Sequence, residues 1–87
     1  MAKKIKIIIA EDHVLYRDGL KTMLSSHNDF DIIAEAENGS ILIKLFEFHK
    51  PDIVLMDINM PILNGIEATK FITAHFIETK VIAITMN

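Results

Sequence analysis

The sequence predicts an α/β fold with a doubly wound parallel sheet. Short β-branched runs without polar alternation are typical of strands that are buried on both faces. Segments with apolar residues at helical spacing separate these runs, and strict alternation of strand and helix favours parallel strands joined by right-handed crossovers. The chain has 87 residues, of which 51% are hydrophobic. It therefore fits one small domain and is too apolar to be intrinsically disordered.

Four runs are predicted to be strands, and they span residues 4–10, 31–36, 53–56 and 81–84. Three helices are expected between them, because apolar side chains recur there at three- and four-residue intervals. Gly39 and Pro51 bracket the second helix. The apolar residues that indicate the helices are Leu15, Leu20, Met23 and Leu24 in the first, Ile41, Leu42, Leu45 and Phe46 in the second, and Ile66, Ala68, Phe71, Ile72 and Phe76 in the third.

Composition excludes several classes of function. The chain has no cysteine, which excludes disulfides, thiolate metal sites and a cysteine nucleophile. The net charge is −3 and the lysines are scattered, so this segment is not expected to bind nucleic acid itself. Its apolar runs are far shorter than a membrane span requires. We therefore expect a cytoplasmic protein without a membrane segment.

Acidic residues follow two of the predicted strands. Glu11 and Asp12 come after the first strand, and Asp57 comes after the third. Ligands of open parallel sheets bind beyond the carboxyl ends of the strands, so neighbouring strands would bring these carboxylates together. Two unit charges about 4 Å apart repel by roughly 4 kcal/mol at an effective dielectric of 20. Such a cluster needs a cation, and oxygen ligands favour Mg²⁺.

Asp12 and several other residues near the predicted strand ends also have interpretations that involve no ligand. Asp12 stands where an N-cap for the first helix is wanted. Thr85 follows the last strand, but threonine is a common strand residue. The histidines are expected at the surface, with His13 alone near the acids. The methionines and most phenylalanines are expected to pack in or around the core, namely Met23, Met56, Met60, Met86, Phe46, Phe48, Phe71 and Phe76.

Three segments together resemble the receiver domain of two-component response regulators. They are residues 7–12 (IIIAED), residues 53–65 (IVLMDINMPILNG) and residues 81–85 (VIAIT). Residues 11–20 (EDHVLYRDGL) further resemble the LuxR-type transcriptional branch. The resemblance implies a flavodoxin-like sheet with strand order 2-1-3-4 and makes residues 1–87 a response regulator receiver domain.

The resemblance also implies roles for individual residues. Asp57 would accept a phosphoryl group from a sensor histidine kinase. Asp12 would bind Mg²⁺ directly, Glu11 would act mostly through water, and the backbone carbonyl of Asn59 would be a further ligand. Thr85 would contact the phosphoryl group and act as the switch.

Part of the receiver pattern is not present before Asn87. A fifth strand with its lysine, the last helices and a DNA-binding output domain are missing, which indicates a chain truncated at its C-terminal end. Lys80 lies at the wrong end of the fourth strand to replace that lysine. An uncovered fourth strand predicts a homo-oligomer that pairs through this edge.

Two other functions remain open, although a signalling domain rather than an enzyme is expected. Haloacid-dehalogenase-like phosphatases also use a strand-end aspartate with Mg²⁺, but they carry a second aspartate two residues later. Here that position is Asn59. A fragment of a receiver that performs no function is the other alternative.

Overall fold

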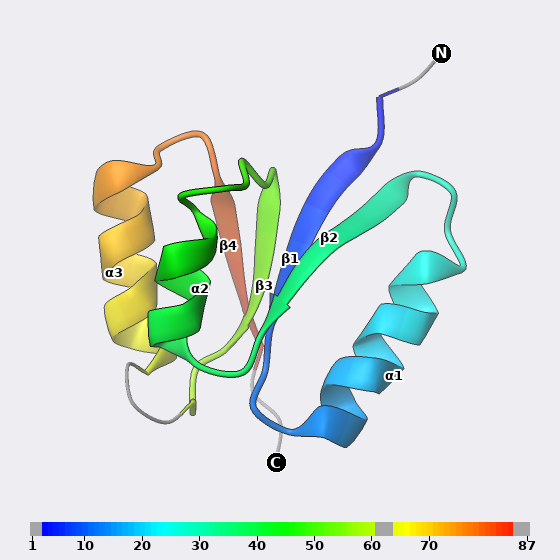
Figure 1. The fold of residues 1–87 in the computed structure, drawn as a ribbon, viewed down its shortest axis with the longest axis horizontal. Coiled ribbons are helices and arrows are strands. Elements are labelled where there is room, and N and C mark those ends of the chain that lie inside the picture. The colour runs from blue at the N-terminus through cyan, green and yellow to red at the C-terminus, as the bar shows by residue number, and fades with distance from the viewer. Residues whose placement is uncertain (1–2, 61–63, 85–87) are drawn as a thin grey trace.

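The computed structural model describes residues 3–60 and 64–84 and shows the predicted alternation of strands and helices (Figure 1). Each element begins within a few residues of the sequence prediction. The elements in chain order are β1 (Ile5–Ala10), α1 (Val14–Ser25), β2 (Phe30–Ala36), α2 (Gly39–Leu45), β3 (Ile53–Asp57), α3 (Gly65–His75) and β4 (Lys80–Ile84).

The strands form one parallel sheet in the order β2-β1-β3-β4, which confirms the predicted doubly wound topology. Ala10 at the end of β1 pairs with Ala36 of β2 on one side and with Met56 of β3 on the other. Ile84 at the end of β4 pairs with Asp57. The carboxyl ends of β1 and β3 therefore lie side by side at one edge of the sheet.

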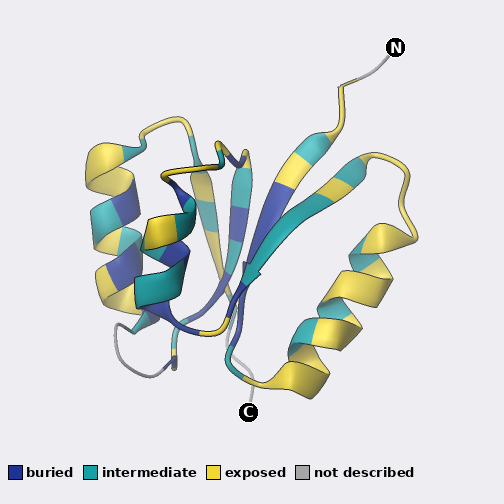
Figure 2. Ribbon diagram, in the orientation of Figure 1, coloured by how far each residue is buried: buried dark blue, intermediate teal, exposed yellow. Residues whose placement is uncertain are grey.

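Helices α2 and α3 pack on one face of the sheet, and α1 lies on the other side (Figure 1). The core lies between the sheet and the α2–α3 pair. Its fully buried side chains come from the centre of the sheet and from the inner faces of these helices (Figure 2), and include Ile8, Val54, Met56, Leu42, Ala68 and Ile72. Burial on both faces explains why β1 and β3 are apolar without alternation.

The apolar face predicted for the first helix is partly wrong. Leu15 and Met23 are 83% and 57% exposed, whereas Arg17, Leu20 and Leu24 are half-buried. These three residues share one side of α1, so the helix is turned by about one position from the orientation that we predicted. The prediction failed because an arginine occupies the inward-facing side of the first turn.

The predicted core is correct for most of the other methionines and phenylalanines. Met56 and Met60 are buried, as is Phe46, and Phe71 and Phe76 are half-buried. Phe48 is wrong, because it lies in the turn after α2 and is 79% exposed. Met86 lies outside the described residues.

No helix in the part of the chain that the structure describes combines the length and the apolarity that crossing a membrane would require.

Candidate metal centre

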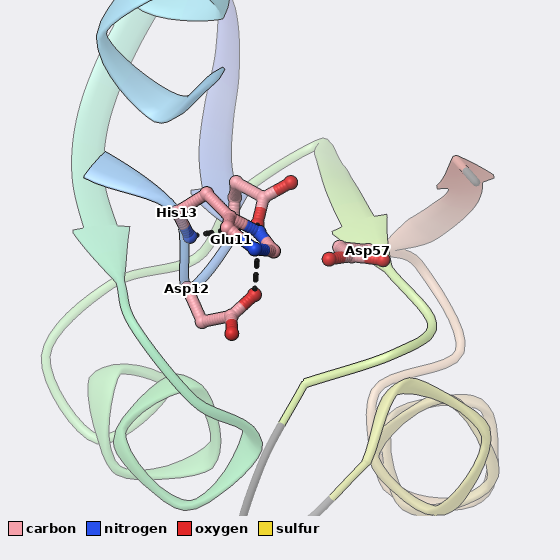
Figure 3. Close-up of side chains that lie close together, drawn as sticks. All are labelled: Glu11, Asp12, His13 and Asp57. Carbon is pink, nitrogen blue, oxygen red and sulfur yellow. Dashed lines mark hydrogen bonds and ion pairs between the residues drawn. The ribbon is translucent and has the colours of Figure 1, made fainter. Parts of the chain in front are cut away.

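The three predicted acids meet at one edge of the sheet, together with a histidine. Glu11 and Asp12 follow β1, and Asp57 is the last residue of β3 (Figure 3). Ligand atoms of Glu11, Asp12, His13 and Asp57 all lie within 4.8 Å of one another. The parallel register of β1 and β3 produces this convergence, because both strands end at the same edge.

Two oxygens of this cluster are buried and unpartnered. The side chain of Glu11 is fully buried and Asp57 is only 2% exposed. Among the described residues, neither Glu11 Oε1 nor Asp12 Oδ1 finds a hydrogen-bond partner. Buried carboxylate oxygens without donors are costly unless they are protonated or ligate a cation. These oxygens therefore suit a metal ion.

Asp12 does not cap the first helix. Helix α1 begins at Val14 with His13 in the N-cap position, and no side chain makes a cap hydrogen bond there. In contrast, α2 and α3 have asparagine caps: Asn38 accepts a hydrogen bond from the Ile41 N–H, and Asn64 accepts one from the Glu67 N–H. The capping interpretation of Asp12 is wrong, which leaves its carboxylate free for another role.

Asp57 is positioned by the loop that follows it. The backbone N–H of Asn59 donates to Oδ1 of Asp57 at 3.0 Å. The Gly65 N–H, at the start of α3, donates to the carbonyl of Ile58 at 3.2 Å. These two hydrogen bonds tie the turn after β3 to α3. They orient the Asp57 carboxylate while its other oxygen stays available.

Arg17 anchors the turn that carries Glu11. Its guanidinium donates to the carbonyl oxygen of Glu11 at 2.8 Å and lies 3.4 Å from the carboxylate of Glu35 on β2. The Glu11 N–H donates to the carbonyl of Ala36. Both backbone groups of Glu11 are thus fixed by β2 and α1. Sequence reasoning missed Arg17, because nothing in the spacing shows that its side chain points inward.

His13 was predicted near the acids, but the contacts of its ring with Glu11 and Asp12 were not predicted. Oε2 of Glu11 lies 2.9 Å from the His13 backbone nitrogen, which donates to it, and 3.2 Å from the ring Nδ1. The hydrogen bond to Glu11 raises the pKa of the His13 imidazole, and the charge of Asp12 raises it further. The side chain is nevertheless 59% exposed, as we predicted for the histidines. Its place directly after two acids was the only signal available.

The remaining predicted site residues lie elsewhere. Lys80 begins β4 and pairs with Ile53, at the end of the sheet opposite Asp57. It cannot reach the acids, as expected from the sequence. Thr85 lies outside the described residues.

Burial disfavours the ionised form of the Glu11 carboxyl group. Desolvation raises the pKa of the Glu11 carboxyl above its ordinary value, and the neighbouring Asp12 and Asp57 carboxyls raise it further, while hydrogen bonds from His13 lower it. A carboxyl with a raised folded-state pKa contributes stability that is fully present below the pKa of the unfolded chain. This contribution is lost as the pH rises through the folded-state pKa.

Glu11→Gln is therefore expected to stabilise the metal-free protein at neutral pH. The amide can still accept the His13 hydrogen bond but carries no charge. We expect a melting temperature above that of the unaltered chain, because the cost of desolvating the charged carboxylate is removed. Thermal unfolding in a chelating buffer measures it. Glu47→Gln, in the exposed turn after α2, is the matched control and should change nothing. A destabilised Glu11→Gln protein would contradict this assignment.

The sequence of this chain matches a known protein family. The family described as "Response regulator receiver domain" matches residues 7–87. The transcriptional regulatory protein DegU of Brevibacillus brevis is 39% identical over 84 residues, which are 97% of this chain and 36% of that protein. The transcriptional regulatory protein LnrK of Bacillus subtilis is 44% identical over 81 residues, which are 93% of this chain and 37% of that protein.

A solved structure agrees in fold. The two-component response regulator of the LuxR family from Aurantimonas superposes with a TM-score of 0.90 at 28% identity, over 98% of this chain and 61% of that one. The chain spans little more than a third of the length of the two curated relatives. From the family match, the identity to these relatives and the shared fold, it follows that this chain belongs to the response regulator receiver domain family.

Proposed function

We propose that residues 1–87 act as a phosphoacceptor signalling segment in which Asp57 receives the phosphoryl group. The observation that carries the proposal is the placement of Asp57. Its carboxylate is buried at the end of the central strand β3, is oriented by the Asn59 N–H, and faces a pair of acids with unpartnered oxygens.

The donor set fits Mg²⁺. Glu11, Asp12 and Asp57 offer carboxylate oxygens, which are the ligands that Mg²⁺ prefers. Asp12 and Asp57 would hold the ion directly, Glu11 would act mostly through water, and the Asn59 carbonyl would add a backbone oxygen. Bound Mg²⁺ would neutralise the acids and polarise the phosphoryl oxygens.

The contribution of the chain itself is to position one nucleophile, the carboxylate of Asp57. In the transfer, an oxygen of Asp57 forms a bond to phosphorus while the phosphorus–nitrogen bond of a phosphohistidine breaks, and the imidazole leaves with the electron pair. The hydrogen bond from Asn59 fixes one Asp57 oxygen and leaves the other to attack. The anchored Glu11 backbone keeps the metal-binding acids from moving away. Thr85 would contact the phosphoryl group afterwards.

The proposed partner is a sensor histidine kinase, and the proposed location is the cytoplasm, where such a kinase would present its phosphohistidine. Membership of the receiver family supports both proposals. The curated relatives are named transcriptional regulators. We therefore propose that the signal reaches DNA through an output domain and not through this segment, because the lysines here are scattered.

A phosphatase of the haloacid-dehalogenase type is not favoured. Receiver domains are signalling domains, and the position two residues after Asp57 presents the Asn59 backbone N–H to Asp57 instead of a second carboxylate. We propose a stoichiometric acyl phosphate without turnover of phosphate esters.

Titration with Mg²⁺ tests the site. We expect amide shifts centred on residues 11–13 and 57–60, with Asp12→Asn weakening the affinity about tenfold or more because a direct ligand is lost. Asp31→Asn, an exposed acid on β2, is the matched control and should leave the affinity unchanged. Shifts centred elsewhere, or equal affinities for the two variants, would defeat the proposed site.

We further propose that two copies pair through β4. Within residues 3–60 and 64–84, β4 has a strand neighbour on one side only, and Ile82 is 47% exposed. A second copy of the strand would satisfy the backbone groups of this edge. Light scattering at micromolar concentration should show a dimer or a larger oligomer, and a monomer would refute this pairing.

A further inference from the structure

His13 brings an imidazole nitrogen to a cluster that otherwise offers carboxylate oxygens. Its Nδ1 lies 3.2 Å from a carboxylate oxygen of Glu11 and 3.2 Å from one of Asp12 (Figure 3). Adjacent ligands of a tetrahedral ion bound at roughly 2.0–2.1 Å stand about 3.3 Å apart. The nitrogen is therefore spaced from both oxygens as a neighbouring ligand of one ion would be.

The ring of His13 is held in this direction from two sides. His13 is the N-cap residue of α1, and its carbonyl accepts the hydrogen bond of the Arg17 N–H at 2.9 Å, so its backbone is fixed. The ring makes an edge contact with Tyr16, one helical turn further on, at 5.5 Å between centroids and an interplanar angle of 74°. An exposed histidine without these contacts would sample several rotamers.

The acids beside this ring have capacity for an ion. Oε1 of Glu11 belongs to a fully buried side chain, and within the residues that the structure describes it has no hydrogen-bond partner. Oδ1 of Asp12 is also buried and makes no hydrogen bond in the described part of the chain, although the Asp12 side chain as a whole is partly exposed and this oxygen lies 3.2 Å from His13 Nδ1. The buried, unpartnered Oε1 of Glu11 points to a cation independently of His13, because the contacts of His13 with Glu11 are made to Oε2.

We propose that Nδ1 of His13, together with the carboxylates of Glu11 and Asp12, binds a borderline transition-metal dication such as Zn²⁺ in preference to Mg²⁺. Imidazole is a good ligand for Zn²⁺, whereas Mg²⁺ selects oxygen and keeps its water. Binding through Nδ1 uses the neutral imidazole with its proton on Nε2, so a proton carried by Nδ1 is released to solvent when the ion binds. The proposal rests on the proposed function, since both ions would use the same carboxylates.

Zn²⁺ titration of the unaltered 87-residue chain, followed by NMR of the histidine ring nitrogens, tests the ligand directly. We expect the His13 Nδ1 resonance to move while His27, His49 and His75 keep their shifts. His13→Gln should lower the Zn²⁺ affinity about tenfold or more and change the Mg²⁺ affinity less than about threefold. His27→Gln, an exposed histidine after α1, is the matched control and should alter neither affinity.

Three results would overturn the inference: an unmoved His13 resonance, an unchanged Zn²⁺ affinity in His13→Gln, or equal losses of Zn²⁺ and Mg²⁺ affinity. The last would show that His13 only positions the acids. The ring-nitrogen measurement needs no variant, so it holds even if His13→Gln folds poorly. If Mg²⁺ produces no shifts at residues 11–13 and 57–60 of the unaltered chain, the proposed function fails. If Mg²⁺ binds normally but the His13 ring does not respond to Zn²⁺, this inference is wrong and the proposed function is unaffected.

Discussion

Asp57→Asn is expected to abolish phosphoryl incorporation from a small phosphodonor with Mg²⁺. The substitution keeps the size of the side chain and an acceptor for the Asn59 N–H, but it removes the carboxylate nucleophile. Intact-mass spectrometry measures the result as the phosphorylated fraction. We expect labelling of the unaltered chain and none of Asp57→Asn, because only the carboxylate can form the acyl phosphate.

Asp52→Asn is the matched control for this experiment. Asp52 is exposed at the beginning of β3, where it accepts a hydrogen bond from the Lys6 N–H. It is therefore an aspartate of the same strand region at the opposite end of the sheet, and its variant should label as the unaltered chain does. Full labelling of Asp57→Asn would mean that another residue is the acceptor.

Among the proposed substitutions, Gly65→Ala is expected to cause the largest loss of stability. A methyl group at Gly65 would collide with the Cα of Ile58 and would lie 2.7 Å from the carbonyl oxygen of Asp57. Both are backbone atoms, so the loop after β3 or the start of α3 must move. We expect a loss of about 3 kcal/mol, with a fall of roughly 10 °C or more in melting temperature.

Gly19, in the middle of α1, provides the control. A Cβ added at Gly19, inside α1, meets no atom within 4 Å. Gly19→Ala should therefore stabilise the protein by up to about 1 kcal/mol through helix propensity. Chemical denaturation compares the two variants. If Gly65→Ala is as stable as Gly19→Ala, then the close approach of α3 to the Asp57 loop does not exist in solution.

The convergence of the three acids could be predicted from the sequence because their positions follow from topology alone. Glu11, Asp12 and Asp57 each come at the end of an apolar run, and parallel strands place such ends at one edge. The site needed no knowledge of side-chain packing. The same reasoning correctly put Lys80 at the far end of β4.

Features that depend on side-chain direction could not be predicted in this way. Periodicity placed Leu15 on the buried side of α1, but the inward side carries Arg17, whose guanidinium reaches the Glu11 carbonyl. The orientation of His13 depends on where α1 begins, because His13 is the N-cap residue of this helix. Phe48 looked like a core residue from its type, although it lies in a turn.

Chemical trapping of the phosphorylated residue tests the central claim most directly. After incubation with a small phosphodonor and Mg²⁺, borohydride reduces an acyl phosphate to an alcohol, and peptide mapping then identifies the altered side chain. The account predicts one reduced residue, at position 57, which disappears when Mg²⁺ is chelated. Reduction at Glu11 or Asp12, or a stable phosphate on any histidine in place of Asp57, would contradict it.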